Sequence, residues 1–148
     1  MKRYINKKAE YEYKILERWE AGISLKGIEV KSIREGKINF TNSFIRIKRE
    51  EVFLCNFHIS PYSKGNKSDY EPKRERKLLL HRKEIKSLIG KLTQRGLTLI
   101  PLSIYCKKGK IKIEIGLAKG RRLFDKRRKL REKSAEEETK RVLKLFNK

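Results

Sequence analysis

The stretch from Leu102 to Ala118, LSIYCKKGKIKIEIGLA, decides the fold. Apolar side chains occupy alternate positions on both sides of a polar turn, Lys107–Lys110. They are Leu102, Ile104 and Cys106 before the turn, and Ile111, Ile113, Ile115 and Leu117 after it. A period of two is typical of strands, and two strands around a glycine-containing turn predict a hairpin with one apolar face.

Two regions nearer the N-terminus also alternate. Residues 10–16 predict a half-buried strand. Its inward side chains would be Tyr11, Tyr13 and Ile15. Phe44–Lys48 and Val52–Ile59 lie on either side of a polar turn and predict a second hairpin. On the second of these strands, the expected common face consists of Phe53, Cys55, Phe57 and Ile59.

Two segments have helical spacing instead. Leu25–Arg34 predicts a helix that Gly36 ends. A second helix is predicted to begin at His81, where Glu84 has the spacing of a capping box, and to end at Gly96. Its apolar side chains would be Ile85, Leu88, Ile89 and Leu92.

Residues 60–75 are polar, contain Pro and Gly, and predict a loop. Several antiparallel strands interrupted by two short helices predict a mainly β fold. We expect residues 1–118 to form a small antiparallel OB-like β-barrel with flanking short α-helices. Barrels of this kind are common platforms for nucleic acid.

The composition points to a polyanionic partner. The 148 residues include 41 Lys and Arg but only 18 Asp and Glu, a net charge of +23. Such a surplus destabilises a compact chain by self-repulsion, so nucleic acid is the first expected partner, ahead of membrane surfaces and acidic proteins. Because the chain has no export signal and no apolar run long enough to span a membrane, we expect a cytoplasmic protein with reduced cysteines.

The last 30 residues, 119–148, carry 13 Lys and Arg against 5 Asp and Glu. Apolar residues are too sparse there to form a core. We expect a basic C-terminal tail that is disordered when free and helical when bound. On composition alone, a permanently solvated tail is an equal alternative.

Catalytic and metal-binding patterns are weak. Cys55 and His58 stand three apart in a predicted strand and would face opposite ways, and the Cys and His spacing fits no zinc pattern. We therefore expect no metal, no cofactor and no enzyme. A small ribonuclease that uses His58 and His81 as general base and acid is the enzyme alternative.

Basic stretches are the stronger signal. Lys73–Lys77 (KRERK) and Arg121-Arg122 can bind phosphates bidentately. Aromatic residues beside basic segments can stack on unpaired bases. For Tyr62 and Tyr70 we favour a role in anchoring their loop. Phe124 has several basic but few apolar neighbours, which favours stacking.

Six motifs then occur in a specific order: EAGISLKGIEVKSIREGKIN, HISPY, KRERKLLLH, GLTLIPLSIY, IGLAKG and DKR. With them the chain resembles the small protein B family, the bacterial SsrA-binding proteins, from Asn6 to about Arg131. The resemblance implies a monomeric RNA-binding adaptor with no membrane partner. Its barrel would bind the tRNA-like domain of transfer-messenger RNA.

The resemblance further implies that the protein, transfer-messenger RNA and elongation factor Tu form a complex. This complex would be delivered to the A site of stalled ribosomes. There the tail would lie along the vacant mRNA channel against the small-subunit RNA, and the ribosome would be rescued while its product is tagged. A generic OB-fold RNA-binding protein or a ribosomal protein is the alternative that shares the same charge and barrel.

The resemblance also implies individual contacts. The residues expected to bind transfer-messenger RNA are Glu20, Leu79, His81 and Lys112. Alternation with Ile111 and Ile113 independently predicts that Lys112 is exposed. For Glu20 a structural salt bridge is an equal alternative, and His81 stands where relatives often have Asn. The residues expected to contact the decoding centre and mRNA channel are Gly120, Arg121, Arg122, Phe124, Asp125, Lys126 and Arg127.

Overall fold

The predicted C-terminal hairpin forms one side of a closed barrel. The computed structural model describes residues 1–62, 70–94 and 96–120, and in it β8 (Leu97–Lys107) pairs antiparallel with β9 (Lys110–Gly120). Lys108 and Gly109 connect them with φ angles of 51° and 75°. Two consecutive positive φ angles are typical of the two-residue turns that fit the twist of a hairpin.

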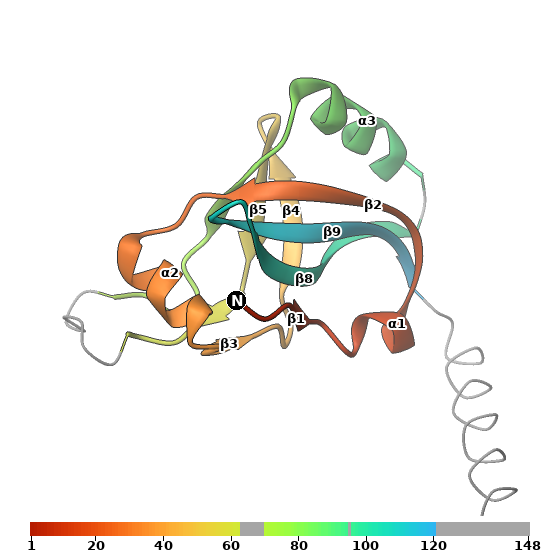
Figure 1. Cartoon of the computed structure of the whole chain (residues 1–148). Helices are drawn as coiled ribbons and strands as arrows, with labels where there is room; N and C mark the ends of the chain where they lie inside the picture. Colours follow the sequence, from red (N-terminus) through yellow and green to blue (C-terminus); the bar gives the residue numbers. More distant parts are fainter. Residues whose placement is uncertain (63–69, 95, 121–148) are drawn as a thin grey trace, which may run out of the picture.

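The barrel closes because β8 has partners on both edges. Around the barrel the strand order is β8, β4, β5, β7, β2, β9 and back to β8, with β1 added on β8 (Figure 1). A second sheet contains only β3 and β6. The remaining bounds are β1 (Tyr4–Ile5), α1 (Ala9–Glu12), β2 (Tyr13–Ile23), α2 (Gly27–Arg34), β3 (Ile38–Asn39), β4 (Phe44–Lys48), β5 (Glu51–Cys55), β6 (His58–Ile59), β7 (Arg76–Leu79) and α3 (Arg82–Leu92).

The core lies inside this barrel and follows the predicted alternation in Ile111, Ile113 and Ile115. On β8 the alternation fails at Leu102, which is buried in a separate cluster with Ala9 and Ile100, beside a pairing irregularity between Pro101 and Ser103. Ile104, Ile113 and Ile115 are fully buried. Burial of each such side chain contributes about 1.5–3 kcal/mol. The mainly β antiparallel barrel with short helices is thereby confirmed. No helix of the described residues is long and apolar enough to cross a membrane.

Both predicted short helices are present as α2 and α3. Gly36, with a φ angle of 75°, follows α2 as expected. The backbone N–H of His81 donates a hydrogen bond of 3.1 Å to Glu84 Oε1, which satisfies a donor at the start of α3. The helix ends at Leu92, four residues before Gly96.

The predicted strand over residues 10–16 is wrong in its first half. Ala9–Glu12 forms one helical turn, and Ala9 is buried beside Ile100 and Leu102. Strand β2 begins at Tyr13 and continues to Ile23, far beyond the predicted end, because β9 supplies hydrogen-bonding partners along its length. An irregularity in the pairing occurs between Ile15 and Glu17.

The predicted strand Val52–Ile59 is divided at Asn56, whose φ angle is 57°. Asparagine is one of the residues that tolerate this left-handed conformation. β5 therefore ends at Cys55, and β6 pairs with β3 in the second sheet. The expected face is confirmed as buried for Cys55, Phe57 and Ile59, but it is wrong for Phe53, because the fully buried residues of β5 are Val52 and Leu54.

The predicted loop over residues 60–75 is followed by a strand, β7, that the sequence pattern did not predict. β7 begins at Arg76, which is fully buried although it belongs to the KRERK stretch. Its Nε and Nη2 donate to Glu29 Oε2 at 2.8 and 2.5 Å. Arg74 Nη2 donates to Glu29 Oε1 at 2.5 Å. The prediction that this stretch binds phosphate is therefore wrong for Arg76, whereas Arg74, whose side chain is 30% exposed, has one nitrogen engaged with Glu29.

Glu29 is itself fully buried on α2. Burial raises the pKa of its carboxyl, but hydrogen bonds from Arg74, the Lys26 backbone N–H and Arg76 outweigh that effect and hold the pKa below its usual value. The remaining donors of Arg76 bond to the backbone oxygens of Phe57 and Pro72. A fully hydrogen-bonded buried ion pair thus joins α2 to the start of β7.

Candidate nucleic-acid interface

A row of four residues crosses the outer face of the barrel. In the strand register, Tyr105 on β8 faces Lys112 on β9, Lys112 faces Gly22 on β2, and Gly22 faces Leu79 on β7. Gly22 has no side chain, so Lys112 and Leu79 lie on either side of a gap. A Cβ atom at Gly22 would lie 3.2 Å from Leu79 Cβ, so a larger residue would crowd this gap.

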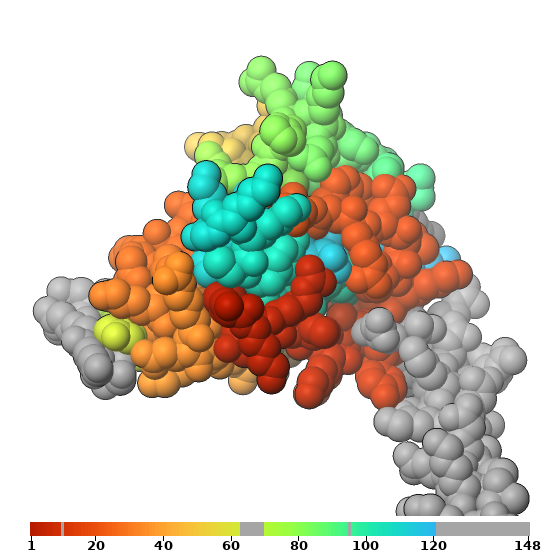
Figure 2. Space-filling model, in the orientation of Figure 1, coloured from red at the N-terminus to blue at the C-terminus, as the bar shows by residue number. Residues whose placement is uncertain are grey.

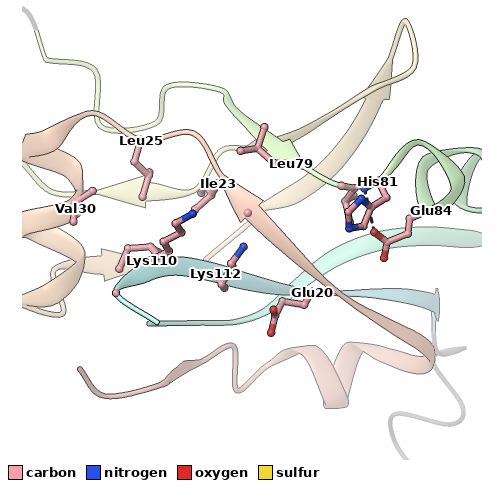
Figure 3. Close-up of a pocket in the computed structure, with 13 residues that line it drawn as sticks. Glu20, Ile23, Leu25, Val30, Leu79, His81, Glu84, Lys110 and Lys112 are labelled. Atoms are coloured by element: carbon pink, nitrogen blue, oxygen red, sulfur yellow. Dashed lines mark hydrogen bonds between the residues drawn. The ribbon is translucent and has the colours of Figure 1, made fainter. Parts of the chain in front are cut away.

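This gap belongs to a groove of about 610 Å³. The four residues predicted to bind RNA all line it: Glu20, Leu79, His81 and Lys112. Figure 3 shows Leu25 and Val30 toward one end of the groove and His81 with Glu84 toward the other. The first end is mainly apolar, with the ammonium group of Lys110 also lying there, and the other end is polar.

Leu79 is the most unusual residue of the groove. Its side chain is 54% exposed although it follows the fully buried Leu78. Exposed leucines are common singly, but here the leucine stands beside cationic and anionic groups in a concave surface. Lys112 is half-buried, which agrees with its predicted outward direction. Lys110, also in the groove, is exposed.

Glu20 is an ionised acceptor in the lining of the groove. The Tyr105 hydroxyl donates to Glu20 Oε2 at 2.5 Å, and Lys107 Nζ lies 3.3 Å from Oε1. The hydrogen bond from Tyr105 lowers the pKa of Glu20 most, and together with Lys107 and Lys112 it outweighs the opposing effect of burial. The salt bridge left open by the sequence exists, yet the Glu20 side chain remains 37% exposed.

The two histidines occupy different places. His81 is exposed at the start of α3 and lines the groove. His58 lies on β6 in the two-stranded sheet and is not among the groove residues. This arrangement gives the ribonuclease alternative no support. Within residues 1–62, 70–94 and 96–120, no three His, Cys, Asp or Glu side chains are grouped so that they could hold a metal ion.

The aromatic residues of the 60–75 region act as expected where they are described. The Tyr70 hydroxyl donates to the Ile59 backbone oxygen at 2.8 Å, which confirms its anchoring role. Lys31 Nζ lies 5.4 Å from the centroid of the Tyr62 ring. Both rings are therefore engaged with the protein itself.

Sequence reasoning missed Gly22, Tyr105 and Lys110. The alternation of β8 predicts that Tyr105 faces away from the apolar side of the strand, and the sequence holds no other sign of its contact with Glu20. Gly22 could not be recognised because its importance comes from its two cross-strand neighbours. Gly120 is exposed at the end of β9. The predicted contacts Arg121, Arg122, Phe124, Asp125, Lys126 and Arg127, and the predicted tail conformation, lie outside the described residues.

Comparisons with known proteins agree on one family. A family model described as SmpB protein matches residues 4–145. The SsrA-binding protein of Carboxydothermus hydrogenoformans is 52% identical over 138 residues, which cover 93% of this chain and 93% of that protein. The SsrA-binding protein of Caldicellulosiruptor saccharolyticus is 54% identical over 141 residues, or 95% of this chain and 89% of that protein.

A solved structure gives the same result for the fold. It is described as "tmRNA-SmpB: a journey to the center of the bacterial ribosome". Its matching chain is 49% identical and superposes with a TM-score of 0.69, covering 82% of this chain and 85% of that one.

Proposed function

The chain belongs to the SmpB family, and on that basis we propose that it is an RNA-binding adaptor of trans-translation. It binds transfer-messenger RNA and supports the rescue of stalled ribosomes and the tagging of their products. The observation that carries the proposal is the groove, in which Glu20, Leu79, His81 and Lys112 meet although they come from different parts of the chain.

The groove has the chemical groups that an unpaired region of RNA requires. Lys110 and Lys112 supply positive charge for phosphates, whose contacts release counterions. The exposed Leu79 offers apolar surface to a base or ribose. A carboxylate such as Glu20 repels phosphate but accepts hydrogen bonds from base amino groups, so it favours bases over backbone. We assign the tRNA-like domain of the RNA to this groove.

The basic segment would serve a different RNA. We propose that the barrel, residues 1–118, holds transfer-messenger RNA while residues 119–148 contact the small ribosomal subunit. The high positive charge of the segment and its family motifs support this division. Phe124 would stack on a nucleotide of the decoding centre, between the basic residues on either side of it. Elongation factor Tu would accompany the delivered complex. The proposal contains no catalytic step.

Sequencing the RNA that copurifies with the tagged protein tests the function directly. We expect one dominant species with a tRNA-like fold and an internal reading frame. Recovery of ribosomal RNA alone, together with a protein that stays on ribosomal subunits in high salt, would favour the ribosomal-protein alternative. Cleavage of RNA by the purified protein that is lost on changing His58 or His81 would favour the ribonuclease.

Variants of the groove test the site. We expect Leu79→Ala and Glu20→Gln each to weaken binding of the tRNA-like domain by about tenfold in gel shifts, because single base contacts contribute about 1–3 kcal/mol. Leu16→Ala is the matched control, since Leu16 is 45% exposed on the same barrel but does not line the groove. Unchanged affinity in both groove variants would show that RNA binds elsewhere.

A further inference from the structure

Two carboxylates face each other beside the groove. Glu20 on β2 is the direct cross-strand neighbour of Glu114 on β9. Like charges in that position repel and destabilise a sheet. The two carboxylates bind different partners. Glu114 Oε1 accepts from Arg18 Nη1 at 2.8 Å, whereas Glu20 Oε2 accepts from the Tyr105 hydroxyl. The orientation of Glu20 therefore depends on Tyr105.

Tyr105 is held in place from its other side. β1 pairs with β8 so that Tyr4 faces Ile104, and the same register brings Arg3 to Tyr105. Figure 2 shows the N-terminal residues, in dark red, lying against the β8–β9 hairpin in teal. The Arg3 guanidinium carbon lies 4.1 Å from the centroid of the Tyr105 ring, and Arg3 Nη1 lies 3.9 Å from Glu114 Oε2. A stacked guanidinium restricts the ring and with it the hydroxyl.

We propose that Tyr105 is a positioning residue for RNA recognition, which orients the Glu20 carboxylate so that its other oxygen, Oε1, accepts from the amino group of an unpaired base. Oε1 also lies 3.3 Å from the exposed Lys107 Nζ, and a carboxylate oxygen can accept two hydrogen bonds. The proposal rests on the proposed function, because it requires Glu20 to contact RNA. Tyr105 is not among the described residues that line the groove, and its hydroxyl donates to Glu20, so in this proposal it acts through Glu20.

The chemistry of the hydroxyl suits this role. Burial raises the pKa of Tyr105, and its hydrogen bond to Glu20 raises it further. The hydroxyl therefore stays protonated and donating over the physiological range. A glutamate that is already oriented loses less side-chain freedom when RNA binds, and immobilising one flexible side chain weakens binding by about three- to tenfold.

A double-mutant cycle tests the proposal. Affinity for a transcript of the tRNA-like domain is measured for the full chain, for Tyr105→Phe, for Glu20→Ala and for the double variant. We expect Tyr105→Phe to weaken binding about three- to tenfold in the native background and to have no further effect in the Glu20→Ala background, which lacks an acceptor for the hydroxyl. Tyr13→Phe is the control, because it removes the same atom from β2 outside this groove and should leave the affinity unchanged.

Each other outcome overturns the proposal in a recognisable way. An equal loss from Tyr105→Phe in both backgrounds would mean that the tyrosine contacts RNA itself. No loss in the native background would mean that Glu20 needs no positioning. If Glu20→Ala alone had no effect while Leu79→Ala did, the assignment of Glu20 would be wrong. If the native protein did not bind the transcript, the proposed function would fail instead.

A second readout needs no RNA. The Glu20 carboxyl is titrated by NMR in the free protein, where Tyr105 and, more weakly, Lys107 and Lys112 hold its pKa low. Tyr105→Phe should raise the pKa of Glu20 toward the usual value of about 4.3, and Tyr13→Phe should not. An unchanged pKa in Tyr105→Phe would contradict the contact on which the proposal depends.

Discussion

Replacement of Glu29 by alanine is expected to lower the free energy of unfolding by about 3–5 kcal/mol, because the variant leaves a charged guanidinium buried without its carboxylate. Glu29 and Arg76 are both fully buried, and two donors of Arg76 bond to one oxygen of Glu29. The measurement is urea-induced unfolding of the full chain, monitored by circular dichroism. The dependence of the free energy of unfolding on urea concentration should be the same in both proteins.

Glu35→Ala is the matched control for this experiment. Glu35 follows the same helix and forms an ion pair of 3.0 Å with Lys37, but the side chains are 37% and 42% exposed. Exposed pairs contribute about 0–1 kcal/mol, so this variant should unfold almost like the native protein. A similar loss of unfolding free energy in both variants would show that the buried pair contributes no more than an exposed one.

The buried ion pair also joins two elements that carry groove residues. Glu29 belongs to α2, which carries Val30 at the apolar end of the groove. Arg76 begins β7, which carries Leu79. Since one ion pair ties both elements together, the groove should lose its shape before the rest of the barrel does when the pair is weakened.

The second large effect is expected at the far end of the chain. We predict that changing Asp125, Lys126 and Arg127 together to alanine leaves binding of transfer-messenger RNA within several-fold of the native value but abolishes tagging. The physical reason is the proposed separation of surfaces, in which the groove holds transfer-messenger RNA and the basic segment contacts the ribosome. RNA affinity is measured by gel shift, and tagging is measured in reconstituted translation of a message without a stop codon.

The control variant removes one acidic and two basic residues from the barrel instead of from the basic segment. Arg34, Glu35 and Lys37 are one acidic and two basic residues, all exposed near the end of α2. Their joint replacement by alanine should leave both RNA binding and tagging close to native. A wholesale loss of RNA affinity in the variant of residues 125–127 would contradict the division of labour between barrel and basic segment.

Much of the fold could be predicted from the sequence because its signals are local. The period of two in Leu102–Ala118 and the turn within it predicted the hairpin β8–β9, which the structure confirms. The spacing between His81 and Glu84 predicted the start of α3. The surplus of positive charge predicted a polyanionic partner, and six ordered motifs indicated the family to which the chain belongs.

The tertiary structure decided what depends on residues far apart in the chain. Local pattern made Arg76 a phosphate-binding candidate, but Glu29, 47 residues away, turns it inward. A left-handed residue, Asn56, moved the buried face of β5 to Val52 and Leu54. The direction of Arg76 depends on a distant partner that compensates its burial, and the buried face of β5 depends on the backbone conformation at one residue, and periodicity carries no information about either.

The candidate site shows the same division. Motif resemblance named Glu20, Leu79, His81 and Lys112 one at a time, and alternation predicted the outward direction of Lys112. Only closure of the barrel brings β2, β7 and β9 into register, so that Gly22 leaves a gap between Leu79 and Lys112. The sequence by itself therefore determined the chemical groups, whereas non-local strand pairing determined that they form one groove and that Tyr105 orients its carboxylate.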